Sequence, residues 1–333
     1  MTEYFRPIAM TDPARPNEAF TLAGGWCWFD RVEVLTRGGT SRIVPAQDIP
    51  AEVLERLTAP RVDVAGLSMA APQIMGILNV TPDSFSDGGK YIAPDAALTQ
   101  GRKMIADGAT IIDVGGESTR PGAAFVPQDE EIARVANVVQ TLARDGAIVS
   151  IDTRKAAVAK VAADAGAMIL NDVAAMTFDP AMADVAADTG LPICLMHAQG
   201  DPKTMQDDPV YDDVLLDVYD FLAERIAAAE AAGVSRDQII VDPGIGFGKT
   251  LDHNLALLAR LSLFHALGCP ILLGASRKRF IGVISGAQEA ADRMPGSVSV
   301  ALDAWRQGVQ IIRVHDTLPT KQAFSLTQAI NEG

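Results

Sequence analysis

From residue 74 onward the chain repeats one theme, in which a short β-branched run ends in polar or glycine residues and an alanine-rich amphipathic segment follows. Short apolar runs bounded by turn residues are typical of parallel strands buried on both faces. The intervening segments have helical periodicity: within 213–232, Val214, Val218 and Leu222 share one face, and Gly233 follows as a stop signal. The theme occurs eight times, at Ile74–Val80, Thr110–Gly116, Ala147–Thr153, Met168–Ala174, Leu191–His197, Gln238–Gly244, Pro270–Ser276 and Val309–Asp316.

Eight repeats of strand and helix match the size and strand count of a (β/α)8 barrel. A doubly wound open sheet has the same alternation, so alternation alone does not separate the two folds. We favour the barrel because the count is eight. The prediction is an α/β chain with a (β/α)8 TIM barrel over residues 71–333 and an N-terminal accessory segment over residues 1–70.

The N-terminal 70 residues depart from the theme. Here we predict short strands within Phe20–Asp30 and Arg31–Arg37, which glycine pairs interrupt, and a helix over Pro50–Ala59. The segment would form a small strand-rich cap, with Trp26 and Trp28 anchoring it to the barrel. We expect the chemistry of the barrel to survive the removal of residues 1–65.

The net charge of −14 opposes binding to nucleic acid and to anionic membranes, so an anionic substrate would need a local basic cluster. The three cysteines lie far apart and form no C-x-x-C pair, which is typical of reduced thiols in a cytoplasmic protein. The N-terminus has no apolar signal-peptide core, and no run approaches the roughly 18 apolar residues that span a membrane. We therefore expect a cytoplasmic protein with no membrane partner.

In a barrel of this kind the chemistry gathers at the carboxyl ends of the strands. Taken one at a time, polar residues there are ordinary helix caps or loop residues. Taken together they predict one polar-lined mouth. In chain order the runs end in Asn79, Asp113 with Glu117, Asp152, Asn171, His197, Asp242, Ser276 with Lys278, and Arg313 with His315.

The stretch DPGIGFGKT, residues 242–250, is similar to a nucleotide-binding phosphate loop, but its spacing excludes that function. Such a loop needs a glycine five residues before Gly248, where this chain has Pro243. The feature that remains is Asp242, a carboxylate at the end of a strand. Such a group is suited to bind the N–H groups of a ligand or a metal.

Two other loops carry chemistry-bearing residues. The loop that follows Asn79 is rich in Thr, Pro, Asp, Ser and Gly, and its oxygen ligands suit Mg²⁺. The loop GGESTRPGA, residues 115–123, contains Arg120, whose guanidinium could bind a phosphate through two hydrogen bonds.

Over roughly residues 72–318 the chain resembles the dihydropteroate synthase family of folate biosynthesis. The matching motifs, in order, are ILNVTPDSFSDGG, IIDVGGESTRPGA, SIDTRK, LNDVAA, MHAQGDPKTMQ, DPGIGFGK, GASRKRFIG and RVHD. The resemblance implies a (β/α)8 barrel and a homodimeric, Mg²⁺-dependent transferase. Such an enzyme joins 6-hydroxymethyl-7,8-dihydropterin pyrophosphate to p-aminobenzoate, releases pyrophosphate and is a target of sulfonamides. The N-terminal 70 residues exceed the short hairpin of the family and stay unexplained.

The chemistry of a pterin agrees with the residues at the strand ends. Asp242 can accept the exocyclic amine and a ring N–H together, and Asn171 can pair with an adjacent donor and acceptor. Asp152 can accept the N–H on the other side, while Lys278 donates to the carbonyl and a ring nitrogen. By resemblance, further pterin contacts come from Asp113, Met196, Gly246 and Phe247.

The resemblance places Arg313 and His315 at the terminal phosphate, beside Asn79, which supports Mg²⁺. Thr119 and Arg120 arrive from the second loop. The set expected to act in catalysis is thus Asn79, Arg120, Lys278, Arg313 and His315. The p-aminobenzoate pocket is expected to be lined by Thr119, Pro121, Phe247, Ser276 and Lys278.

Since the nucleophile is a neutral aniline nitrogen and pyrophosphate is a good leaving group, we expect positioning and electrostatics, with no covalent enzyme adduct. His253 and His265 are expected to have no role, while His197 and Lys249 stay open. One alternative is a pterin-binding domain of a corrinoid-dependent methyltransferase, which has no use for an arginine–histidine pyrophosphate site. Another is a non-catalytic homologue.

Overall fold

The computed structural model describes residues 2–81, 93–118, 123–200 and 204–332. Thr119, Arg120 and Pro121, which we predicted to bind substrate, lie outside the described residues, as does most of the loop after Asn79.

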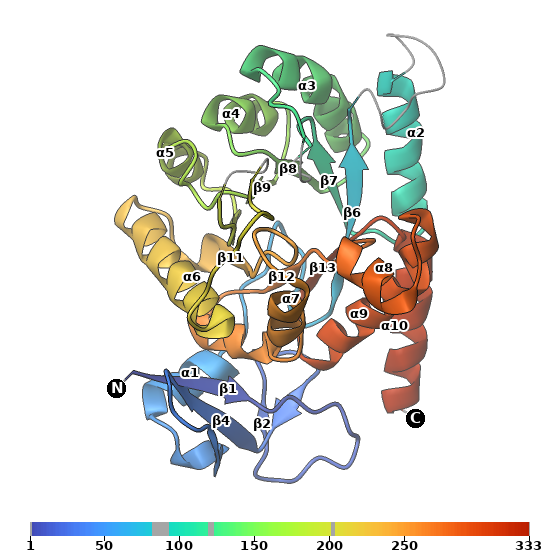
Figure 1. Cartoon of the computed structure of the whole chain (residues 1–333). Helices are drawn as coiled ribbons and strands as arrows, with labels where there is room; N and C mark the ends of the chain where they lie inside the picture. Colours follow the sequence, from blue (N-terminus) through green and yellow to red (C-terminus); the bar gives the residue numbers. More distant parts are fainter. Residues whose placement is uncertain (1, 82–92, 119–122, 201–203, 333) are drawn as a thin grey trace.

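Eight parallel strands form one sheet in the order β11-β10-β9-β8-β7-β6-β13-β12 (Figure 1). The two ends of this order meet through a parallel bridge between Val241 and Ile271, so the sheet closes on itself. The predicted barrel is confirmed, and the open sheet is excluded. Strand β6 (Gln73–Asn79) begins one residue before its predicted run. The other strands lie inside theirs: β7 (Ile111–Gly115), β8 (Val149–Asp152), β9 (Ile169–Asp172), β10 (Ile193–Met196), β11 (Ile239–Asp242), β12 (Leu272–Leu273) and β13 (Ile311–Val314).

Helices surround the strands (Figure 1). The predicted helix over 213–232 is confirmed: Asp213 caps it by accepting the N–H groups of Leu215 and Leu216. The predicted inward face, including Val218 and Leu222, is buried. The barrel helices are α2 (Ala93–Ala106), α3 (Gln128–Arg144), α4 (Ala156–Asp164), α5 (Ala181–Thr189), α6 (Val214–Ala231), α7 (Leu251–Leu258), α8 (Arg279–Ser285), α9 (Met294–Arg306) and α10 (Thr317–Glu332), with short 3-10 helices η3 (Arg236–Gln238) and η4 (Leu261–Leu267). No helix in the described part of the chain is both long and apolar enough to cross a membrane.

An apolar cluster fills the end of the barrel where the strands begin. Its strand residues include Met75, Ile111 and Ile240, and Val64 and Met69 pack against them from the preceding segment. The floor of the barrel is therefore closed by side chains, and the polar residues that end the strands lie at the opposite end.

All three cysteines of the chain are buried and free, so the predicted thiol state is confirmed.

The N-terminal segment forms a three-stranded antiparallel sheet in the order β1 (Glu3–Pro7), β4 (Arg31–Thr36), β5 (Arg42–Pro45). A short hairpin of β2 (Phe20–Thr21) and β3 (Trp28–Phe29) and the helix α1 (Ala51–Thr58) complete it. Strands β1 and β5 were not predicted, because they are only 5 and 4 residues long. In Figure 1 the arrows of β6 and β7 point away from this sheet, so it lies at the end remote from the mouth.

Side chains fasten the N-terminal segment to the barrel. Trp26 stacks on Trp305 with ring centroids 5.9 Å apart and donates its indole N–H to the Trp305 carbonyl at 2.8 Å. Arg37 forms ion pairs with Asp217 and Asp220 of α6 at 2.6 and 2.7 Å. The indole N–H of Trp28 instead donates to the carbonyl of Asp12, which belongs to the same segment. Of the two tryptophans, Trp26 is therefore the one whose indole N–H is bonded to the barrel.

Candidate active site

The carboxyl ends of β7, β8, β9 and β13 bring four predicted residues into one hydrogen-bonded cluster. Arg313 donates from Nε to Oδ2 of Asp113 and from Nη2 to Oδ2 of Asp152, both at 2.6 Å. Asn171 donates from Nδ2 to Oδ2 of Asp113 at 3.1 Å. The guanidinium predicted at a phosphate is thus bound to two carboxylates in this structure.

The cluster holds two carboxylates against one guanidinium. Burial raises the pKa of Asp152; the charge of Arg313 opposes this rise and the neighbouring Asp113 adds to it. Burial acts to lower the pKa of Arg313, but Asp113 and Asp152 together raise it above its ordinary range. Oδ1 of Asp113 is buried and has no hydrogen-bond partner among the described residues. A buried acceptor of this kind is suited to receive an N–H from a ligand.

Asp242 ends β11 and starts the glycine-rich turn. Its Oδ1 accepts the N–H of Gly244 at 2.7 Å, and burial raises the pKa of its carboxyl against the opposing effect of Lys278. Gly244 has a φ of +66°, and a Cβ there would lie 1.8 Å from the carbonyl oxygen of His197. A side chain at Gly244 is therefore excluded by both conformation and space, which keeps the turn close to β10.

Lys249 anchors this turn from inside. Its ammonium donates to the carbonyls of Gly244 at 2.9 Å and Phe247 at 3.0 Å, and it lies 2.8 Å from Nδ1 of His197. Burial lowers the pKa of Lys249, and burial with the nearby Lys249 charge lowers the pKa of His197 to about 2. Of the two readings left open for Lys249, the solvated one is wrong. His197 is a buried neutral ring that packs edge-on against Phe221.

Lys278 extends from the loop after β12 toward the same turn. Its ammonium donates to the carbonyl of Ile245 and lies 4.4 Å from the centre of the Phe247 ring. Burial lowers the pKa of Lys278 to about 8, although Asp242 acts to raise it. Lys278, Phe247 and Asp242 therefore lie in one region of the mouth.

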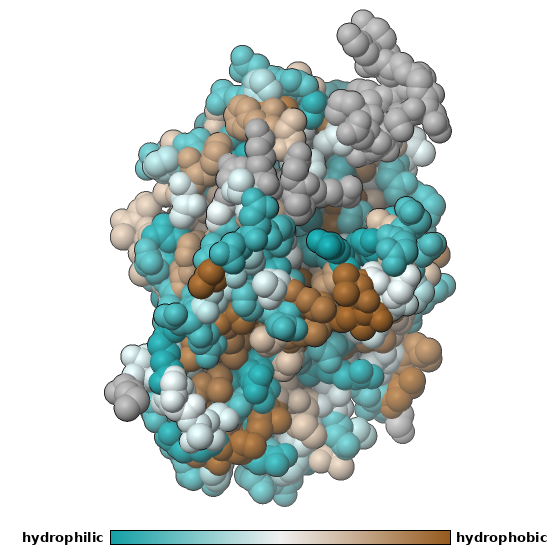
Figure 2. Space-filling view, in the orientation of Figure 1, coloured by the Kyte–Doolittle hydropathy of each residue, from teal (hydrophilic) through white to brown (hydrophobic). Residues whose placement is uncertain are grey.

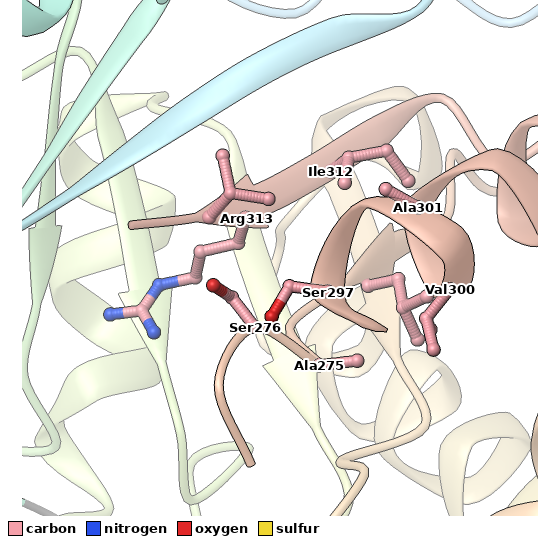
Figure 3. A pocket seen from close by; sticks show the side chains of 9 residues that line it. Ala275, Ser276, Ser297, Val300, Ala301, Ile312 and Arg313 are labelled. Carbon is pink, nitrogen blue, oxygen red and sulfur yellow. The ribbon is translucent and has the colours of Figure 1, made fainter. Parts of the chain in front are cut away.

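Ser276 and His315 link the loops after β12 and β13. The backbone N–H of His315 donates to Oγ of Ser276 at 3.1 Å, and Nδ1 of His315 lies 3.0 Å from the same oxygen. A small pocket is lined from α9 by Ser297, Val300 and Ala301, from β13 by residues that include Arg313, and from the loop after β12 by residues that include Ser276. In Figure 3 the guanidinium of Arg313 extends away from the α9 side chains.

Two more predicted residues end the strands β6 and β10. Asn79, the last residue of β6, is half-buried and pairs in register with Gly115. Met196, the last residue of β10, is buried and pairs in register with Asp242. Of the histidines expected to have no role, His253 caps α7 with Thr250, and His265 is fully buried in η4.

A buried ion cluster at the edge of the mouth was not predicted. Lys155 forms ion pairs with Glu117 at 3.1 Å and with Glu131, and Arg154 pairs with Glu117 at 3.2 Å. Glu131 also accepts from the hydroxyl of Thr153 at 2.7 Å. Three separate segments meet here: Glu117 is indicated by its place at the end of the second run, but no local pattern indicates that Arg154, Lys155 and Glu131 meet it.

Comparison with known proteins agrees with this geometry. A family model described as "Pterin binding enzyme" matches residues 75–315. The chain is 48% identical over 264 residues to the dihydropteroate synthase of Escherichia coli K12, a match that covers 79% of this chain and 93% of that protein.

Solved structures give the same result. The dihydropteroate synthase of Xanthomonas albilineans in complex with 7,8-dihydropteroate is 41% identical, with a TM-score of 0.75 and coverage of 82% of this chain and 100% of that one. The Yersinia pestis dihydropteroate synthase with a sulfonamide drug complex is 46% identical, with a TM-score of 0.77 and coverage of 82% and 99%. On these matches and on the barrel mouth described above, the chain belongs to the family of pterin binding enzymes.

Proposed function

We propose that this chain catalyses the dihydropteroate synthase reaction, in which 6-hydroxymethyl-7,8-dihydropterin pyrophosphate and p-aminobenzoate give 7,8-dihydropteroate and pyrophosphate. The observation that carries the proposal is the mouth itself, where Asp113, Asp152 and Asn171 lie around Arg313. It is supported by the 48% identity to a dihydropteroate synthase and by a structural relative that holds the product.

The pterin is proposed to bind through its polar edge. Asp242 accepts the exocyclic amine and ring N–H, while Asn171 and Asp152 pair with donors and acceptors along the ring. The unpartnered Oδ1 of Asp113 supplies one more buried acceptor. Lys278 donates to the carbonyl and a ring nitrogen, with Gly246 and Met196 alongside the ring. Each buried polar group would thereby gain a partner, which is what makes such a site selective.

The pyrophosphate is proposed to lie toward Arg313 and His315. Arg313 already contacts the carboxylates assigned to the pterin, so it would bridge the pterin end and the pyrophosphate end of the site. Arg120 and Thr119, which lie outside the described residues, are proposed to add to this end. The amine nitrogen of p-aminobenzoate then forms the new C–N bond at the pterin methylene as the C–O bond to pyrophosphate breaks. The nitrogen loses its proton, and no side chain is alkylated.

Mg²⁺ is proposed as the cofactor, held by Asn79 and by the phosphate oxygens of the substrate. The side-chain amide oxygen of Asn79, the last residue of β6, is an oxygen ligand of the kind that suits Mg²⁺. Mg²⁺ commonly takes few protein ligands and relies on substrate phosphates. When bound, the ion would neutralise charge on the leaving group.

The p-aminobenzoate ring is proposed to lie between Phe247, Lys278 and Ser276, with Pro121 and Thr119 completing the pocket. The ring of Phe247 is half-buried, and Lys278 lies over it at 4.4 Å. A sulfonamide imitates p-aminobenzoate and should therefore compete for the same place. The relative from Yersinia pestis with a sulfonamide drug complex supports this assignment.

We also propose a cytoplasmic homodimer. Three buried free thiols suit a reducing compartment. Figure 2 shows hydrophobic surface in the region of α8, where Val283 and Ile284 are 58% and 60% exposed. On α10, Leu326 and Ile330 are 64% and 68% exposed. Sedimentation at micromolar concentration would test the assembly, and a monomer there would contradict it.

Direct turnover tests the reaction. Purified protein is mixed with the dihydropterin pyrophosphate, p-aminobenzoate and Mg²⁺, and both products are measured. We expect dihydropteroate and pyrophosphate in equal amounts, with both lost when Mg²⁺ is chelated. A folded protein that binds a pterin but makes neither product would contradict the proposal and favour a non-catalytic homologue.

A further inference from the structure

Arg277 has a left-handed backbone conformation, with a φ of +58°, although it is not a glycine. It stands between Ser276 and Lys278, two residues proposed to bind substrate. Residues other than glycine, asparagine and aspartate rarely adopt this backbone conformation. Where another residue adopts it, the surrounding structure enforces it.

Two side chains near the start of α9 hold the backbone of Arg277. Oγ of Ser297 accepts its N–H at 2.8 Å, and Nη1 of Arg293 donates to its carbonyl at 3.1 Å. Ser297 is buried and itself donates to the carbonyl of Arg293 at 2.8 Å. Both polar backbone groups of Arg277 are therefore fixed from one side.

The side chain of Arg277 is fixed from the other side by Asp316. Nε and Nη2 donate to the two carboxylate oxygens at 2.9 and 2.5 Å, a fork-to-fork pair. The carboxylate is mostly buried, with its side chain 12% exposed. Asp316 directly follows His315, which is proposed to bind the pyrophosphate.

This ion pair continues the register of the barrel beyond the strands. In β12 and β13, Leu272 pairs with Ile311 and Leu273 with Ile312. The Ser276–His315 bonds and the Arg277–Asp316 pair each join residues 39 apart, which is the same spacing as those strand pairs. Since β12 contains only two residues, these side-chain links align the two loops where backbone pairing has ended.

We infer that Arg277 and Asp316 are positioning residues, which hold the loop carrying Ser276 and Lys278 in register with the end of β13, where Arg313 and His315 lie. The inference rests on the proposed function, since those four residues are its substrate groups. The ion pair acts through its neighbours and does not itself contact the reacting atoms.

The test compares Asp316→Asn and Arg277→Gly with wild type. Asparagine keeps the shape of aspartate but not its charge. Glycine adopts the left-handed conformation without strain but has no guanidinium to pair with Asp316. Both should lower kcat about tenfold or more, because small misplacements of substrate groups are costly. Both should also weaken the binding of pyrophosphate with Mg²⁺, measured by calorimetry without turnover. Arg277→Lys, which keeps the charge but not the fork, should fall between them and wild type.

Two controls separate positioning from loss of stability. Arg236 and Glu230 form a similar forked ion pair far from the mouth, at 2.8 and 2.9 Å, so Glu230→Gln should leave kcat and KM unchanged. Arg277→Ala should lose activity as Arg277→Gly does but melt at a lower temperature, since alanine is strained at this φ.

Unchanged kcat, KM and pyrophosphate affinity in Asp316→Asn and Arg277→Gly would overturn the positioning role, as would an equal loss in Glu230→Gln. If wild type made no product, the proposed function would fail instead. The pyrophosphate affinities of the same variants would then still decide whether the pair orders the site.

Discussion

At the level of single residues, the mouth contains buried carboxylates that could accept hydrogen bonds from a ligand. Arg313 forms ion pairs with both Asp113 and Asp152, so one positive charge faces two carboxylates, and Asp242 is buried nearby. Surplus buried acceptors are unfavourable unless donors reach them. A planar ligand edge rich in N–H groups, such as that of a pterin, would supply those donors.

Replacing Asp242 tests this view. In Asp242→Asn one acceptor becomes an NH₂ donor that opposes the N–H groups of the ring. A hydrogen bond to a charged group contributes about 1.5–3 kcal/mol, so pterin affinity should fall roughly tenfold to a hundredfold. Calorimetry with 6-hydroxymethylpterin measures it, and the exposed Asp292→Asn serves as the control. Equal affinities in wild type and Asp242→Asn would assign the ring to another carboxylate.

Lys278 predicts a pH dependence. Because burial lowers its pKa to about 8, the ammonium is present below about pH 8 and is lost as the pH rises above it. Pterin affinity should therefore decrease above pH 8, by at most about tenfold per pH unit. Lys278→Arg keeps its charge throughout, so its affinity should be lower at pH 7 but lack this decrease. The measurement is affinity from pH 6.5 to 9.5, and parallel profiles for the two proteins would sink the assignment.

Residue type and strand position were sufficient to predict which side chains gather at the mouth. Asp113, Asp152, Asn171 and Arg313 were named from the sequence and form one cluster in the structure. Their mutual bonds could not be predicted, because the partner of a long side chain such as that of Arg313 depends on three-dimensional distances. The left-handed Arg277 was missed for a similar reason, since no local sequence rule favours arginine there.

At the level of elements, the turn after β11 depends on one buried ammonium. Lys249 supplies hydrogen bonds to two carbonyls of the turn, and Asn254 of α7 accepts the N–H of Gly246 at 2.7 Å. The turn is therefore held by side chains from other parts of the chain.

Lys249→Met should consequently destabilise the protein. Methionine has a similar length but leaves the carbonyl of Phe247 without its side-chain donor, whereas the carbonyl of Gly244 keeps the backbone N–H of Phe247. An unsatisfied buried group costs about 1–3 kcal/mol, so we expect the free energy of unfolding to fall by about that amount. Urea denaturation measures it, with the exposed Lys160→Met as the matched control. A change no larger than in that control would mean that water replaces the ammonium.

The strand–helix order of the barrel was predicted because each run has strong apolar and turn signals. Strand length was not: the run over Pro270–Ser276 yields only Leu272–Leu273 as β12. The residues after it leave the ladder to enter the Arg277 turn, which is a tertiary effect. In the N-terminal segment, β1 was missed because its pairing with β4 joins residues as far apart as Glu3 and Thr36, whereas β5 pairs with β4 in a local hairpin but is only 4 residues long.

At the level of the whole molecule, the N-terminal segment and the mouth occupy opposite ends of the barrel (Figure 1). The segment has an apolar core that includes Phe29, Val32 and Leu57 and takes in Ala266 of η4. It therefore shields barrel surface, while the residues proposed to bind substrate lie elsewhere.

Deleting residues 2–58 should separate stability from catalysis. The cut keeps Val64 and Met69, which close the barrel floor, but uncovers the apolar surface beneath the segment. We expect a lower melting temperature and reduced solubility, with KM and the kcat of the folded fraction close to wild type. Trp26→Ala, which removes one anchor, should give a smaller shift in the same direction. A truncated protein that is folded but inactive would show that the segment contributes to the site.

The barrel is a ring with a seam. Between β11 and β12 the described residues form one isolated bridge, Val241 with Ile271, and across it Lys278 reaches the carbonyl of Ile245. Backbone amides beside this seam should be the first of the barrel strands to exchange with deuterated solvent. A pterin bound to Asp242 on one side and to Lys278 on the other would link the two sides of the seam. The substrate would then complete the wall that holds it, and its arrival should be readable as slowed exchange along β11 and β12.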